Sequence, residues 1–138
     1  MNEWVELLKS YYSPQEKAQY VELIKKFIKL SRKARAQGLL SLEGEATAAD
    51  QFLFQKGLEL ICKGICPDDI RSILKSYIIA KDFSNSELLE RNVIIEGMLL
   101  LQSGDSGTTI LEKLLAMFGE GFFCELEPIL WEEEYNFF

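Results

Sequence analysis

The sequence predicts an all-α protein, a compact bundle of about five to six helices that ends in an irregular acidic-aromatic tail. Two observations predict this class. Apolar residues recur at intervals of three and four through most of the chain, and no stretch shows the strict alternation of a half-buried strand. The chain has 138 residues, of which 48% are hydrophobic. This is enough for one domain with a single core.

The first long helix has a clear start and stop. Residues 13–16 read Ser-Pro-Gln-Glu, which combines an N-cap, a proline at the first helical position and a capping-box glutamate. We therefore expect a helix that begins at Pro14 and stops at Gly38. At 100° per residue, its apolar side chains fall on one broad arc and most of its cations fall opposite. Arg35 departs from this division, because it lies at the edge of the apolar arc, where a cation needs a partner or a route to water.

Two further helices are expected in the middle of the chain. Residues 39–46 predict one or two helical turns, after which Asp50 can cap a helix that ends at Gly64. Residues 66–69, Cys-Pro-Asp-Asp, open the next helix, because proline suits the first turn and carboxylates suit the positive end of the helix dipole. The apolar stripe of this helix consists of Ile70, Ile73, Leu74, Tyr77 and Ile78.

The last two helices follow a polar connector. Residues 81–86 are expected to join two helices, and a serine within them, Ser84 or Ser86, to cap the second. A final helix is predicted to begin at Thr108 or Thr109, and glycines stop it.

The C-terminal end differs in composition. The last twenty residues carry six glutamates, no lysine or arginine, and several aromatic residues. We therefore divide the chain into a helical domain, residues 1–121, and an acidic-aromatic tail, residues 122–138. The tail has two interpretations. It is a docking peptide that places Trp131, Tyr135 and Phe138 in grooves of another chain, or it folds back over its own core, against the basic face of the first helix.

The residue inventory disfavours catalysis and metal binding. The chain has no histidine, which removes the commonest general base and a common zinc ligand. It also lacks a phosphate-binding loop and a nucleophile motif. The three cysteines, Cys62, Cys66 and Cys124, form an odd set that fits reduced thiols better than disulfides. We expect no enzyme, no cofactor and no metal site.

Charge and hydropathy suggest a location and exclude some partners. A basic stripe lies on the first long helix, at Lys25, Lys29, Arg32 and Lys33. The net charge of −7 nevertheless repels nucleic acid and anionic lipid at long range. Apolar runs are too short to span a bilayer, and the N-terminus has neither the basic region nor the cleavage site of a signal peptide. We expect a cytoplasmic protein without a membrane span.

Three stretches, in this order, share their pattern with one known family. They are residues 32–43 (RKARAQGLLSLE), residues 52–74 (FLFQKGLELICKGICPDDIRSIL) and residues 94–118 (IIEGMLLLQSGDSGTTILEKLLAMF). They resemble the cytoplasmic parts of MotA, the flagellar stator subunit of the MotA/TolQ/ExbB proton-channel family. The matching family segments follow the second transmembrane helix, lead to the third, and follow the fourth. Together they cover about 60 of the 138 residues, and three segments in order are more specific than one.

The departures from the family pattern limit what the resemblance implies. The family's transmembrane hairpin is replaced here by a short linker, residues 81–92, so ion conduction is not implied. In the third stretch, the family's Asn-Pro-Arg becomes Ser106-Gly107-Thr108. The chain thus has the cytoplasmic helices without the channel.

The resemblance also implies a candidate site. In the family, an arginine before the Gly-Leu-Leu segment and a glutamate after it are implicated in electrostatic contact with the rotor protein FliG. These positions correspond to Arg35 and Glu43, and we add the neighbouring cations Arg32 and Lys33 to the predicted site. Alternatively, Arg35 and Glu43 pair with each other or with neighbours inside the fold, where an exposed ion pair contributes only about 0–1 kcal/mol.

Two hypotheses of function follow. The first is a non-enzymatic interaction module that resembles a channel-less MotA and binds FliG or the MotA/MotB stator complex at the inner face of the membrane. The second is a self-assembling scaffold, a homo-oligomer in which the tail of one copy docks on the basic helix of the next. Head-to-tail contact of that kind produces rings or filaments.

Overall fold

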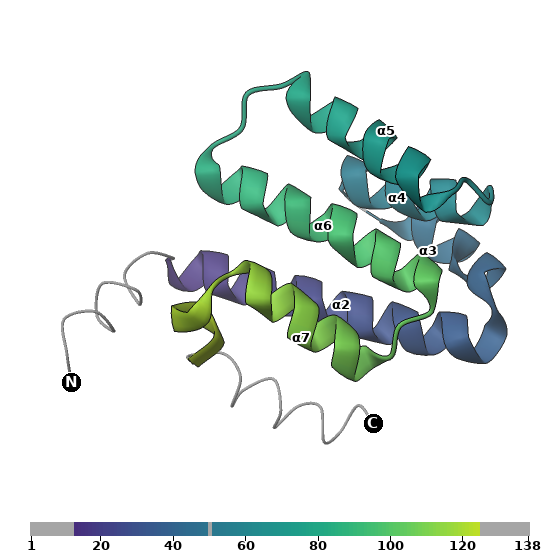
Figure 1. Ribbon diagram of the computed structural model, residues 1–138, viewed down its shortest axis with the longest axis horizontal. Helices are drawn as coiled ribbons and strands as arrows, with labels where there is room; N and C mark the ends of the chain where they lie inside the picture. The colour runs from purple at the N-terminus through teal and green to yellow at the C-terminus, as the bar shows by residue number, and fades with distance from the viewer. Residues whose placement is uncertain (1–12, 50, 125–138) are drawn as a thin grey trace.

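The computed structural model describes residues 13–49 and 51–124. Within these ranges the chain forms helices and turns and no strand, which confirms the predicted all-α class. Trp131, Tyr135 and Phe138 of the predicted tail lie outside the described residues, as does the predicted cap Asp50. The elements, shown in Figure 1, are α2 (Pro14–Gln37), the 3-10 turn η1 (Leu39–Leu42), α3 (Glu43–Ala48), α4 (Phe52–Cys62), α5 (Pro67–Ile79), α6 (Asn85–Ser103) and α7 (Gly107–Met117).

Helix α6 lies at the centre of the bundle. It packs against α2 and α7 on one side and against α4 and α5 on the other, as Figure 1 shows. The elements η1 and α3 turn back beside the end of α2 and contact α4. The molecule therefore has two ends, one where α2 ends and one where α6 begins.

The predicted start and stop of the first long helix are confirmed. The backbone N–H of Glu16 donates to Ser13 Oγ, and the backbone N–H of Ser13 donates to Glu16 Oε1, both at 3.1 Å. This capping box satisfies donors that have no partner inside the helix. The helix ends at Gln37, before Gly38, which has a φ of +90°.

Two glycines allow the central helices to approach closely. A Cβ atom on Gly97 of α6 would overlap the ring of Phe27 on α2. A Cβ atom on Gly57 of α4 would lie 2.6 Å from Cγ of Met98 on α6. Phe27 and Met98 are both fully buried, so the two contacts lie inside the core. The neighbouring residues Gly97 and Met98 thus connect α6 to two different helices.

The connector before α6 is shorter than the predicted linker. Helix α6 begins at Asn85, and Ser84 caps it through a capping box with Glu87. Residues 85–92, which we assigned to the linker that replaces the family's transmembrane hairpin, are therefore helical. The cap fixes this start, because it satisfies the first free backbone N–H groups.

The last helix begins earlier than Thr108 or Thr109. It starts at Gly107, because Ser106 is the N-cap and its Oγ accepts a hydrogen bond from the backbone N–H of Thr109 at 3.3 Å. Threonines 108 and 109 thus lie inside the first turn.

The chain turns helical again after Gly119, at residues 120–124. Phe122 is buried, with its ring centroid 4.7 Å from that of Phe118 and 5.8 Å from that of Tyr20. The first residue of the predicted tail therefore belongs to the core. The division of the chain into a domain and a tail stays a prediction.

Replacing Gly97 with alanine is expected to lower the free energy of unfolding by about 1–3 kcal/mol, because the added methyl group must displace the Phe27 ring. The matched control is Gly44→Ala, since a Cβ atom on Gly44 meets nothing within 4 Å and alanine favours a helix by up to about 1 kcal/mol. Urea denaturation followed by circular dichroism measures both. Equal midpoints for Gly97→Ala and the wild type would contradict the close approach of α2 and α6.

Candidate functional site at the end of helix α2

Four of the predicted site residues, Arg32, Lys33, Arg35 and Glu43, lie at the corner formed by the last turn of α2, η1 and α3, residues 32–47. Gly38 makes this corner possible. Its backbone has a φ of +90° and a ψ of 162°, a conformation that residues other than glycine rarely adopt. The Gly38 carbonyl accepts two hydrogen bonds from Ser41, one from the backbone N–H at 3.1 Å and one from the hydroxyl at 2.6 Å. Leu42 is fully buried and anchors the corner to the core.

One ion pair crosses the corner. Nζ of Lys33 on α2 lies 3.1 Å from Oε1 of Glu45 on α3. Both side chains are partly exposed, so the pair contributes about 0–1 kcal/mol to stability. It nevertheless joins the basic segment before Gly38 to the acidic segment after it.

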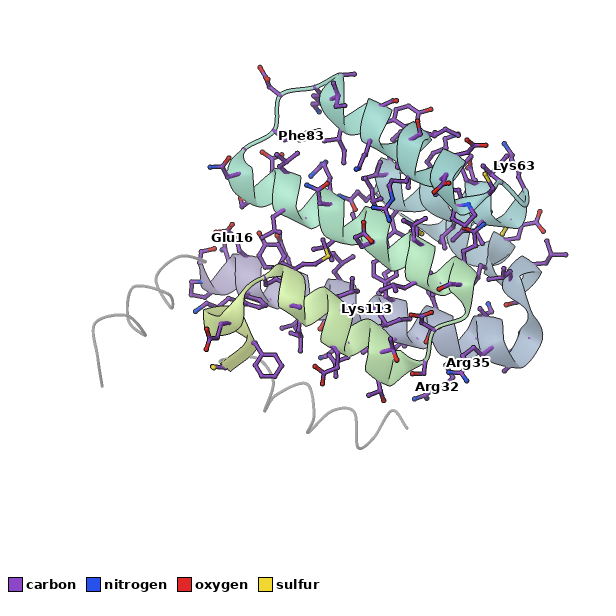
Figure 2. All side chains as sticks on the ribbon, viewed as in Figure 1. Glu16, Arg32, Arg35, Lys63, Phe83 and Lys113 are labelled. Carbon is purple, nitrogen blue, oxygen red and sulfur yellow. The ribbon has the colours of Figure 1, made fainter. Side chains whose placement is uncertain are left out.

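Arg35 and Glu43 are arranged differently. Both are exposed, and neither takes part in an ion pair within residues 13–49 and 51–124. Of the two outcomes predicted for Arg35, a partner or a route to water, the described residues show the second. The alternative in which Arg35 and Glu43 pair with each other is not observed in these residues. Figure 2 shows Arg35 beside Arg32 at the end of α2, and Arg32 is also exposed.

An exposed leucine lies between the two unpaired charges in the sequence. Leu40 is 70% exposed, a high value for a large apolar side chain. Reasoning from the sequence missed it as a site residue, although a signal existed. Leu39 and Leu40 are neighbours in one short turn, and their side chains point in different directions. Both cannot pack on the core, and Leu39 is the one that does.

Leu40 also borders a hollow of about 360 Å³ between α3 and α4. Cys62 lies at this hollow, and its thiol donates a weak hydrogen bond to the Leu39 carbonyl at 3.7 Å. Burial raises the pKa of the Cys62 thiol, and the negative charge of Glu43 raises it further. The thiol is therefore protonated at neutral pH and is a poor nucleophile. The hollow is lined by Leu40, Glu43, Ala46, Thr47, Gln55, Glu59, Cys62 and Lys63.

The basic stripe of α2 is largely engaged within the fold. Lys25 Nζ lies 3.4 Å from Glu22 Oε1. Beside the stripe, Lys26 Nζ lies 4.1 Å from the centroid of the Phe54 ring, a cation–π contact. Lys33 forms the ion pair with Glu45. These contacts provide the stripe with partners other than an acidic tail, and the docking of the tail on this helix stays a prediction.

The corner has the chemistry of a surface that binds protein. It combines an exposed apolar side chain, fixed charges of both signs and an adjoining hollow, the mixture that interfaces between proteins use. Within the described ranges no three ligand side chains are placed to hold a metal ion. None of the described helices is both long enough and apolar enough to cross a bilayer. These features define a helical domain with a candidate protein-binding corner.

The chain is similar in part to a motility protein. It is 41% identical over 54 residues to Motility protein A of Borreliella burgdorferi, a match that covers 39% of this chain and 21% of that protein. The chain thus spans about a fifth of the length of this relative. No family model matches the chain, and no solved structure matches it. The comparison supports a MotA-like relationship for part of the chain.

Iodoacetamide is expected to alkylate Cys62 more slowly than Cys66 and Cys124 at about pH 8, because the raised pKa keeps the Cys62 thiol protonated. Cys66 and Cys124 are exposed. Peptide mass spectrometry over a series of pH values measures each rate. Glu43→Gln removes one cause of the raised pKa, so it should accelerate the labelling of Cys62 and leave Cys66 unchanged. Equal rates for the three thiols in the wild type would contradict this arrangement.

Proposed function

We propose that this chain is a non-enzymatic protein-interaction module of the flagellar motor, which binds the rotor protein FliG or a MotA/MotB stator unit through the corner. The proposal places the protein in the cytoplasm, at the inner face of the membrane. It is supported by the partial similarity to Motility protein A and by the geometry of Arg35, Leu40 and Glu43 at the end of α2.

The observation that carries the proposal is the contrast between two sets of charges at the corner. Lys33 and Glu45 neutralise each other across the turn. Arg35 and Glu43, although close in sequence, remain exposed and unpaired within the described residues. If these charges served only to stabilise the fold, we would expect Arg35 and Glu43 to form an ion pair as Lys33 and Glu45 do. The exposed pair instead suits a partner that presents an acidic group to Arg35 and a basic group to Glu43.

The rigidity of the corner supports binding. Gly38 and Leu42 fix the angle between α2 and α3, so the backbone positions of Arg35 and Glu43 are set before a partner arrives. A surface ordered in advance loses less conformational entropy on binding.

The two kinds of side chain have different roles in this proposal. Exposed charges accelerate association and set its orientation more than they hold a complex together. Burying a leucine side chain is worth about 1.5–3 kcal/mol, so Leu40 supplies the larger part of the affinity. Salt should therefore slow association much more than it accelerates dissociation.

Binding of purified FliG, and of MotA/MotB units in nanodiscs, is measured by surface plasmon resonance. The double reversal Arg35→Glu with Glu43→Lys is expected to slow association by at least about tenfold at low salt. The matched control is Lys75→Glu with Glu112→Lys, which makes the same charge changes at exposed positions on α5 and α7 and should leave binding unchanged. Wild-type protein that binds neither partner at micromolar concentration would contradict the proposal.

Leu40→Ala is expected to weaken the same complex by about 5- to 30-fold, a cost of about 1–2 kcal/mol, chiefly through faster dissociation. The stability of the free protein should change little, because Leu40 is exposed. The unfolding midpoint of the variant provides that control. Dissociation as slow as that of the wild type would show that the partner does not cover the corner.

A further inference from the structure

A second exposed apolar surface lies at the other end of the molecule, where α4 and α6 begin and α5 ends. Figure 1 places this end opposite the corner, and Figure 2 shows Phe83 at one end and Arg35 at the other. Ile79, the last residue of α5, is 82% exposed, more than any other large apolar side chain in the described residues. We call this the α5-end surface, and its members are Phe52, Tyr77, Ile79, Lys81, Phe83 and Arg91.

Aromatic rings line a hollow in this surface. The hollow has a volume of about 300 Å³ and includes Phe52, Tyr77 and Phe83. The rings of Phe52 and Tyr77 meet edge to face, with centroids 5.0 Å apart. Both residues are exposed. An apolar hollow with exposed aromatic walls is a feature of interaction sites rather than of an ordinary solvated face.

Cations hold one wall of the hollow in place. The guanidinium of Arg91 lies 4.0 Å from the centroid of the Phe83 ring, and Lys81 Nζ lies 5.4 Å from it. Arg91 also donates a hydrogen bond to the Glu87 carbonyl at 3.3 Å. The ring, which belongs to the loop between α5 and α6, is therefore joined to α6 through Arg91.

The α5-end surface is complementary to itself in shape. Ile79 projects into solvent, whereas its neighbour Ile78 lines the hollow. One surface thus carries both an apolar projection and a recess with aromatic and apolar walls. In a two-fold dimer the same patch of both copies meets, so a surface with both features can match itself.

Charges of both signs lie on and beside this surface. The exposed cation Lys81 is followed directly by the exposed anion Asp82, and Arg91 lies one helical turn from the exposed Glu87. A partner of a single charge sign would meet repulsion from half of these groups. A second copy offers each sign its opposite.

We propose that the α5-end surface is a homodimer interface with two-fold symmetry, in which Ile79 of each copy enters the aromatic hollow of the other. The dimer leaves the corner of each copy exposed, at the two far ends of the assembly. The dimer therefore presents two partner-binding corners. Two corners bind more tightly than one to a partner that is present in several adjacent copies. The dimer interface does not depend on the function proposed for the corner.

Sedimentation equilibrium of the full chain from about 1 to about 100 µM measures the dimer. The wild type is expected to reach the mass of a dimer within this range. Ile79→Lys should raise the dissociation constant by at least about tenfold, because its ammonium group would lose water among the aromatic rings and meet the cations Lys81 and Arg91, which also line the hollow. Ile79→Glu should raise it by a smaller factor, because its carboxylate loses the same hydration but faces those cations. A loss from both variants, which change the net charge in opposite directions, excludes a general charge effect.

Leu40→Glu is the matched control. It changes a comparably exposed apolar residue at the opposite end and should leave the dimer intact, whereas Ile79→Glu should leave the binding of a single FliG molecule intact. Failure of the dimer and failure of the proposed function are thus measured separately.

Three outcomes would overturn the dimer interface. The first is a wild type that remains monomeric at about 100 µM, as it would if residues 125–138 filled the hollow. The second is a dimer that persists in both Ile79 variants. The third is a monomer that co-sediments with anionic phosphatidylglycerol vesicles and loses this binding in Ile79→Glu, which would identify a membrane-binding surface instead.

Discussion

The close approach of α6 to two neighbouring helices is the constraint on which the rest of the structure depends. Gly97 accepts the ring of Phe27 where any larger residue would collide with it, and the next residue, Met98, lies against Gly57. Because a packed interior cannot absorb even one extra methyl group without displacement, these contacts fix the spacing of α2, α4 and α6. The two ends of the bundle are therefore held at a constant separation.

Polar contacts complete this frame. Arg71 on α5 forms an ion pair with Glu96 on α6, and the side-chain amide of Gln102 donates a hydrogen bond to the Ile65 carbonyl at 2.6 Å. The ion pair joins α5 to α6, and the hydrogen bond joins α6 to the turn before α5. At the opposite end, Gly38 and the Lys33–Glu45 ion pair hold the corner. The two proposed surfaces therefore lie at opposite ends of one continuous frame.

Local signals were sufficient to predict much of the fold. Ser13 caps its helix as its sequence context indicates, and Ser84 is the one of the two predicted candidates that caps α6. Arg35, whose wheel position predicted a partner or a route to water, is exposed. Long-range features were not predictable in this way. The pairing of Lys33 with Glu45 depends on the angle that the backbone takes at Gly38, and a sequence pattern does not encode that angle. The contact of Phe27 with Gly97 joins residues 70 positions apart, whose proximity follows only from the complete bundle.

The exposure of single apolar residues was only partly predictable. Leu40 shares a short turn with Leu39, which was a signal, and Ile79 lies outside the apolar stripe predicted for its helix. Tyr77 belongs to that stripe and is nevertheless 43% exposed. Hydrogen–deuterium exchange with and without purified FliG tests most directly whether the corner is the binding surface. Binding at the corner predicts slower exchange in residues 35–47 and unchanged exchange in residues 77–91. Protection confined to residues 77–91, or at neither end, would contradict it.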